Sequence, residues 1–264
     1  MARPVSFLSD YGHADEFVGV VHGVIARVCP EARVIDLGHG VPRQDVRAGA
    51  AMLARALPHM PAGVHLAVVD PDVGARRRAL ALRTAEDDRL LVGPDNGLLI
   101  PAAMRFGGIA EAVEISHSPW RLEPVSATFH GRDVFAPVTA RLAAGEPLAE
   151  AGAPLEPGEL VALDLPQPRR EDGALVAHVM VIDGFGNVQL DAAPSDLGGR
   201  LGRKVEVGDG RSARYLRTFA DAEPGELLLY EDAAGMLALA VNGGEAAAAL
   251  GDLEPGAEVR LTAS

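Results

Sequence analysis

Cysteine and long apolar runs are nearly absent from the chain, which has 264 residues and Cys29 as its only cysteine. A single cysteine excludes an intrachain disulfide and cannot bind a structural zinc by itself. No segment approaches the roughly 18 consecutive apolar residues of a membrane-spanning helix. The N-terminal segment, which begins MARP, lacks the apolar core of a signal peptide. We therefore expect a cytoplasmic protein without a membrane segment.

Positive charge is also scarce, since 24 Lys and Arg residues face 37 Asp and Glu residues, for a formal charge of −13. Lys204 is the only lysine. Nucleic acids and anionic membrane surfaces both require a concentrated cationic surface, so neither is an expected partner. With 48% apolar and 23% charged residues, the chain can bury a substantial core. These values predict a globular protein.

The first half of the chain alternates short apolar runs with helical patterns from residue 5 to about 145. Helices are expected near 14–28, 45–56, 97–105 and 134–144, and strands at VSFLS, RVID, VHLAVVD, ALALRT and LLVG. This alternation is typical of an α/β domain with a mostly parallel sheet. Glycine-bearing polar loops follow several of these runs, and ligands bind at such strand ends.

The second half has a different pattern. Four prolines lie between about 153 and 170, as in an interdomain connection. Apolar runs separated by glycine-rich turns follow at 175–183, 204–208, 225–231 and 236–242, with one short helix near 244–250. We therefore predict an N-terminal α/β domain over 1–160 and a smaller, β-rich, barrel-like domain over 170–264.

Two carboxylates follow expected strands of the first domain. Asp10 comes directly after VSFLS, where a carboxylate can accept two hydrogen bonds from a diol such as ribose; the alternative is a turn or cap. Asp70 ends VHLAVVD, and arginines 76–78 follow. A carboxylate and a guanidinium from one loop can hold a polar substrate or a water. The alternatives are a surface turn and, with Asp72, a Mg²⁺ site.

Histidine and amide side chains supply two further candidate groups. His130 lies in the loop TFHGRD, and histidine readily acts as acid, base or hydrogen-bond orienter near neutral pH. Asp183, Phe185 and Asn187 lie in IDGFGN, where a phenyl ring can stack on a base and an amide can match an adenine edge; the alternative is a β-turn. The remaining histidines show no paired spacing such as HxxxH, so no metal site is expected.

Six motifs occur in a fixed order: SDYG, HGVPRQDV, VVDPDVG followed by Arg77, VGPDNGLL, TFHGRDVFAP and IDGFGN. In this order the sequence resembles the S-adenosyl-L-methionine (SAM) hydroxide adenosyltransferases, which are relatives of the fluorinases and chlorinases. The similarity runs from about residue 5 to residue 251. It implies hydrolysis of SAM to adenosine and L-methionine by attack of water at ribose C5′, without a cofactor.

The resemblance also implies roles for single residues. Asp70, Arg77 and His130 match the set that acts on water. Because the halogenating relatives have tyrosine at the position of Asp70 and lack the histidine, these residues favour hydroxide over halide as the nucleophile. Three consecutive arginines leave open whether Arg76 or Arg78 takes the place of Arg77.

Substrate binding is implied in both domains. Asp10 matches the aspartate that holds the ribose hydroxyls, while Asp183, Phe185 and Asn187 match residues that contact the methionine amine and the adenine. The resemblance further implies a homotrimer in which the second domain of a neighbouring subunit completes the nucleoside site.

Three positions depart from the family pattern. Asp72 replaces a glycine beside the site, Ala233 replaces a serine that helps to bind the methionine carboxylate, and Ala238 replaces a commonly acidic residue. Other functions remain as alternatives: a protein that binds adenosine or SAM without catalysis, a metal-dependent hydrolase built on Asp10, Asp70, Asp72 and His130, or a SAM-dependent halogenase.

Overall fold

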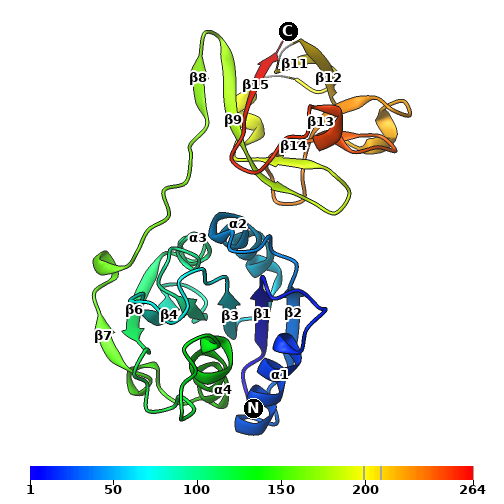
Figure 1. Cartoon of the computed structure of the whole chain (residues 1–264). Helices are drawn as coiled ribbons and strands as arrows, with labels where there is room; N and C mark the ends of the chain where they lie inside the picture. Colours follow the sequence, from blue (N-terminus) through cyan, green and yellow to red (C-terminus); the bar gives the residue numbers. More distant parts are fainter. Residues whose placement is uncertain (199, 209, 264) are drawn as a thin grey trace. The chain divides into compact units, whose positions relative to one another are not determined.

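The chain forms two compact units, Met1–Leu163 and Asp164–Ser264, in a computed structural model that describes residues 1–198, 200–208 and 210–263 (Figure 1). Among the described residues, no helix combines the length and apolar character needed to cross a bilayer. The first unit is an α/β structure and the second is a β-barrel. Both agree with the predicted fold class.

The first unit is built around a seven-stranded sheet of order β2-β1-β3-β5-β4-β6-β7. The strands are β1 Val5–Ser9, β2 Val34–Gly38, β3 Val64–Val68, β4 Ala79–Thr84, β5 Leu90–Pro94, β6 Ile109–Glu114 and β7 Ala153–Leu155. The helices are α1 Phe17–Val28, α2 Val46–Ala56, α3 Ile100–Met104 and α4 Ala136–Ala144. Helices α1 and α4 pack on one face of the sheet, and α2 and α3 lie on the other (Figure 1).

Only one half of the sheet, counted along the strand order, is parallel. Strands β2, β1, β3 and β5 run parallel, whereas β4, β6 and β7 pair antiparallel. The change occurs because the short turn 85–89 joins β4 to β5, and a parallel pair needs a much longer crossover. The parallel half brings the ends of β1 and β3 to one edge, where the loops that carry Asp10 and Asp70 begin.

The expected helices of this unit are present with shifted ends. Helix α1 begins only at Phe17, and Asp45 caps α2 by accepting a hydrogen bond from the backbone N–H of Ala48 at 2.9 Å. A single π-helical turn, Gly131–Phe135, precedes α4. It places His130 at the start of the helical segment.

The second unit closes into a barrel. Its strands follow the order β10-β14-β13-β12-β11-β15-β9, and β9 also pairs with β10 to complete the ring. They are β9 Ala174–Ile182, β10 Val188–Leu190, β11 Lys204–Val207, β12 Arg211–Tyr215, β13 Leu227–Glu231, β14 Leu237–Val241 and β15 Glu258–Ala263. The short strand β8, Arg169–Glu171, pairs with β9 but is not part of the ring. The short helices α5 Pro194–Leu197 and α6 Ala246–Ala249 lie in the connections between strands.

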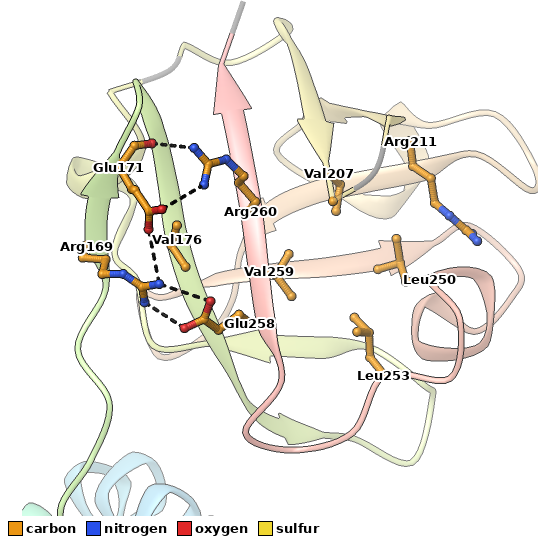
Figure 2. A pocket seen from close by; sticks show the side chains of 11 residues that line it. Arg169, Glu171, Val176, Val207, Arg211, Leu250, Leu253, Glu258, Val259 and Arg260 are labelled. Carbon is orange, nitrogen blue, oxygen red and sulfur yellow. Dashed lines mark hydrogen bonds and ion pairs between the residues drawn. The ribbon is translucent and has the colours of Figure 1, made fainter.

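A cavity of about 560 Å³ lies in the second unit, lined in part by β8, β9 and β15 (Figure 2). Four of its charged groups pair with one another: Arg169 contacts Glu258 at 2.9 Å and Glu171 at 3.3 Å, and Arg260 lies 3.7 Å from Glu171. Exposed pairs of this kind contribute little to stability. These pairs link β8 to β15 across β9 and so occupy the charges of four lining residues.

A buried histidine in the centre of the first sheet makes stability depend on pH. His65 on β3 is 1% exposed and shares a 2.8 Å hydrogen bond between its Nδ1 and Ser6 Oγ. Burial, and to a smaller extent the charge of Arg89, lowers the pKa of His65 to about 3. The unfolded chain therefore binds this proton more tightly, and stability falls as pH drops below about 6.5.

We predict that acidification from about pH 7.5 to about pH 5 lowers the free energy of unfolding by about 2 kcal/mol through His65. Urea denaturation of the wild type and of His65→Gln at both pH values checks this, because the variant loses that part of the pH dependence. His59→Gln, at an exposed histidine, serves as the control. An equal pH dependence in wild type and His65→Gln contradicts the prediction.

Candidate active site

Asp10 stands directly after β1, in the loop that leads to α1. Its Oδ2 accepts a hydrogen bond from the backbone N–H of Gln44 at 2.9 Å. Gln44 has a φ of 62°, a left-handed conformation that turns the loop after β2 toward Asp10. The contact fixes the carboxylate and uses one lone pair of one oxygen, so the group retains the capacity to accept from a diol.

Asp70 and Arg77 form a buried ion pair in the loop between β3 and β4. Arg77 donates from Nε to Asp70 Oδ1 at 2.8 Å and from Nη2 to Oδ2. The two side chains are only 6% and 7% exposed. The guanidinium also lies 5.2 Å from the centre of the Phe135 ring. A two-point pair of this kind fixes the plane as well as the position of both groups.

His130 joins this pair from the loop before α4. Arg77 Nη2 lies 3.0 Å from His130 Nδ1. Because an arginine can only donate, Nδ1 accepts and the remaining proton of the neutral ring is on Nε2. Burial and the charge of Arg77 lower the pKa of His130, against opposing effects of Asp70 and Asp133. The imidazole is therefore neutral near pH 7 and presents an N–H donor.

The loop around His130 is fixed by Asp133, which is 2% exposed. The Asp133 carboxylate accepts from Arg132 Nε at 2.6 Å and from the backbone N–H of Ser126 at 2.8 Å. Within TFHGRD, Arg132 and Asp133 thus fix the loop, and His130 contacts Arg77.

The identity of the pairing arginine is settled by its neighbours. Arg78 donates from Nε to Asp95 Oδ2 at 2.7 Å, and Arg76 is exposed. Successive residues of an extended chain point to opposite sides, so Arg77 and Arg78, which lead into β4, cannot both face Asp70. Arg77 is the arginine that contacts Asp70.

Asp10 and Asp70 line the same cavity, which has a volume of about 440 Å³. Tyr11 also lines it and was not among the predicted site residues. Burial, together with the charges of Asp10 and Asp70, raises the pKa of Tyr11 far above its usual value. The phenol therefore remains protonated. Its place directly after Asp10 in SDYG was the available sequence signal.

The predicted residues of the second unit form one tight loop between β9 and β10. Asp183 Oδ1 accepts from the backbone N–H groups of Phe185 and Asn187 at 2.9 and 3.0 Å, and Oδ2 accepts from Asn187 Nδ2 at 2.9 Å. Asn187 is 7% exposed, whereas Phe185 is 80% exposed. Asp183 and Asn187 thus hold the loop together, and Phe185 is the side chain that faces outward.

This loop borders a cavity of about 530 Å³ that Phe185, Asn187 and Phe219 line in part. An exposed phenyl ring beside a cavity is a suitable stacking surface for a flat base. The phenyl ring of Phe185 is therefore accessible to a ligand, whereas Nδ2 of Asn187 already donates a hydrogen bond to Asp183.

The three positions that depart from the family pattern lie in different surroundings. Asp72 is exposed and lines a cavity of about 690 Å³ together with Arg77. Ala233 is exposed in the turn between β13 and β14. Ala238 is 0% exposed in a small apolar cluster with Tyr230. Of the three, only Asp72 adds a charge beside the candidate active site.

Two family models cover most of the chain. Residues 5–152 match the SAM hydroxide adenosyltransferase N-terminal domain, and residues 177–260 match the C-terminal domain of the same family. The chain belongs to the SAM hydroxide adenosyltransferase family. This confirms the resemblance drawn from the six motifs.

Individual relatives agree with this family assignment. The chain is 54% identical over 259 residues to a protein of Salinispora tropica named (R)-S-adenosyl-L-methionine hydrolase, covering 98% of this chain and 97% of the relative. It is 30% identical to a protein of an Actinoplanes species named Fluorinase, with 90% of each chain covered. A crystal structure of an uncharacterized conserved protein from Thermotoga maritima is 36% identical, with a TM-score of 0.91 and coverage of 98% and 99%.

Gly74 allows the two loops of the candidate active site to approach each other. Its φ is +78°, and a Cβ there would lie 2.1 Å from the carbonyl oxygen of Ala127, in the loop that leads to His130. Neither the conformation nor the distance suits a side chain.

We predict that Gly74→Ala lowers the free energy of unfolding by about 1–3 kcal/mol more than Gly145→Ala does. Gly145, with a φ of +98° and open space around its Cβ direction, measures the conformational cost alone, about 1 kcal/mol. Urea denaturation of both variants checks this. Equal losses would contradict the proposed close approach of the loops.

Proposed function

We propose that this chain hydrolyses S-adenosyl-L-methionine to adenosine and L-methionine, with water attacking ribose C5′. The observation that carries the proposal is the contact of Asp70, Arg77 and His130 beside a cavity that Asp10 also lines. The chain carries this set in a family whose relative from Salinispora tropica is named (R)-S-adenosyl-L-methionine hydrolase.

The leaving group of this reaction requires little help. Attack at C5′ breaks the bond to a positively charged sulfonium, and the electron pair leaves with sulfur as the neutral thioether of methionine. No proton has to be delivered to the leaving group. The catalytic demand therefore falls on the nucleophile, which is water.

Water is a weak nucleophile, and Asp70 alone cannot convert it to free hydroxide. A carboxylic acid of pKa about 4 and water of pKa about 15.7 differ by about 12 units, or roughly 16 kcal/mol. The proton must therefore leave as the oxygen attacks. A site of this kind acts by orienting the water and by stabilising its developing charge.

The observed contacts are suited to this task. His130 presents Nε2–H, and Arg77 has further N–H groups, so both can donate to an oxygen that gains negative charge. Both Asp70 oxygens already accept from Arg77, but each has a second lone pair. We propose that Asp70 accepts a hydrogen bond from the attacking water and receives its proton as the C5′–O bond forms.

Asp10 and the second unit are proposed to hold the nucleoside. Asp10, fixed by Gln44, would accept hydrogen bonds from the ribose hydroxyls. Phe185 would stack on the adenine, and Asp183 and Asn187 would keep its loop in shape while the remaining acceptor of Asn187 faces the substrate. The methionine amine is a further candidate partner of Asp183.

The test is adenosine formation by the purified protein. We predict that Asp70→Asn lowers the rate about 10²- to 10⁴-fold, because it keeps the size of the side chain and removes its charge. Asp72→Asn, in the same loop but exposed, keeps most of the rate. Chromatography of adenosine and methionine after incubation with SAM measures both rates.

The contrary outcomes are distinct. A wild-type protein that binds SAM in calorimetry and releases no adenosine is a binding protein. Formation of a 5′-halonucleoside only when halide is present identifies a halogenase. An Asp70→Asn variant with the full rate removes Asp70 from the mechanism and leaves the reaction itself intact.

We further propose that the enzyme is a homotrimer and that each active site combines the first unit of one subunit with the second unit of its neighbour. The support is the family resemblance, together with the division of the candidate residues between two separately folded units. In such a ring, every site needs two chains.

Mixed trimers test this arrangement. We predict that Asp70→Asn and the double variant Phe185→Ala/Asn187→Ala are each nearly inactive alone, and that co-expression restores activity at about a quarter of the sites. Each restored site takes an intact first unit from one variant and an intact second unit from the other. Absence of any restoration in trimers that contain both chains contradicts the shared site.

A further inference from the structure

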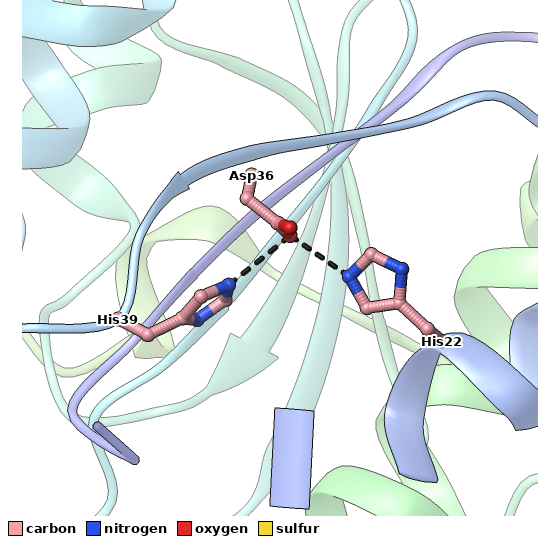
Figure 3. A group of neighbouring side chains, drawn as sticks. All are labelled: His22, Asp36 and His39. Carbon is pink, nitrogen blue, oxygen red and sulfur yellow. Dashed lines mark hydrogen bonds and ion pairs between the residues drawn. The ribbon is translucent and has the colours of Figure 1, made fainter. Parts of the chain in front are cut away.

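Three potential metal ligands meet at the side of the first unit where α1 crosses β2. His22 comes from α1, Asp36 from β2 and His39 from the loop after β2. Figure 3 shows the two imidazole rings on opposite sides of the Asp36 carboxylate. One ligand atom from each residue lies within 4.8 Å of the other two. His22 and Asp36 are 14 positions apart in the sequence, so HxxxH-type spacing could not reveal the cluster.

The spacing of these atoms is close to that of a coordinated metal ion. His22 Nε2 lies 2.9 Å and His39 Nε2 lies 3.1 Å from Asp36 Oδ1. Ligand atoms around a tetrahedral Zn²⁺ with bonds of about 2.0–2.1 Å are roughly 3.3 Å apart. Small side-chain movements would therefore suffice, and His22, which is 34% exposed, is free to make them.

The hydrogen bonding of His39 is an independent observation in favour of a ligand at this cluster. Its side chain is 0% exposed, and Nε2 makes no hydrogen bond among the described residues despite its proximity to Asp36. The contact with Asp36 Oδ1 thus has the distance of an ion pair without the geometry of a hydrogen bond, and a buried nitrogen that lacks a full hydrogen bond is costly. A metal ion would satisfy it.

The second nitrogen of His39 is held as in protein metal sites. His39 Nδ1 lies 2.7 Å from Ser9 Oγ, and Ser9 Oγ also accepts a hydrogen bond from the backbone N–H of Tyr11 at 3.3 Å. If Nδ1–H donates to Ser9, Nε2 presents a lone pair to the cluster. Metal-ligating histidines usually have such an outer partner, which fixes the tautomer and the ring.

We propose that His22, Asp36 and His39 bind one divalent transition-metal ion, with Zn²⁺ as the reference ion and water in the open coordination position. Two imidazoles and one carboxylate suit Zn²⁺ and neighbouring ions, and not Mg²⁺ or Ca²⁺. The site would tie α1 to the end of β2. Through Ser9 it would also brace the loop that carries Asp10, without taking part in the proposed hydrolysis.

Titration of the metal alone tests the proposal. The full chain, purified without a histidine tag and stripped with a chelator, is titrated with Zn²⁺ in calorimetry and with Co²⁺ in visible spectroscopy. We expect one equivalent to bind, with the intense visible absorption of four-coordinate Co²⁺. His22→Ala and Asp36→Asn should each weaken binding at least 10-fold, and His59→Ala, at an exposed histidine outside the cluster, should bind like the wild type.

The contrary results are equally clear. No binding to the wild type at micromolar concentrations, or equal binding to wild type and His22→Ala, overturns the proposal. Circular dichroism of each metal-free variant shows whether it is folded, and Asp36→Asn provides a second reading if His22→Ala is not. Because the assay measures metal and not adenosine, its outcome is independent of the proposed hydrolase activity.

Discussion

The buried ion pair between Asp70 and Arg77 is the interaction on which the candidate active site depends. Each side chain is less than a tenth exposed, so removing one partner would leave an uncompensated charge at a cost of about 3–5 kcal/mol. The pair also sets the position of His130, because the same guanidinium group contacts the imidazole. Two loops that are distant in the sequence are thus organised around one arginine.

The same pair constrains the chemistry. Arg77 is bonded to the carboxylate and the imidazole at once, and together with burial its charge lowers the pKa of the imidazole. A strong base is not available in such an arrangement. What remains is a set of fixed dipoles and charges, which is effective when the reaction needs an oriented water and stabilised charge in place of a free hydroxide.

Much of the fold could be predicted from apolar periodicity, but some strands could not. ALALRT became β4 without a change of bounds, because its first four positions are all apolar. Strand β6, Ile109–Glu114, was not predicted, since it is only partly buried and its sequence IAEAVE favours a helix as much as a strand. The mixed direction of the sheet depends on the short turn at 85–89, a spacing that the sequence contains and that the expectation of a mostly parallel sheet did not take into account.

The site was predictable only in part, for similar reasons. Asp70 and His130 were found through ordered motifs, and no local pattern indicated that they share Arg77. Asp183 holds its own loop by accepting hydrogen bonds from two backbone N–H groups. This role could not be predicted, because the sequence does not give the directions of those N–H groups. His22, Asp36 and His39 meet because a helix crosses a strand, and this kind of proximity depends on tertiary packing.

The cavity beside Asp70 has a further consequence for how ligands enter and leave. Asp10 and Asp15 line it against Arg43, while Arg77 compensates the charge of Asp70. An excess of carboxylates attracts cations over distances of about a Debye length. In the proposed reaction the substrate carries a sulfonium charge, whereas adenosine is neutral and methionine is a zwitterion. Electrostatic attraction would therefore speed the arrival of substrate and vanish once the bond to sulfur is broken, so the same field that captures the reactant does not retain the products.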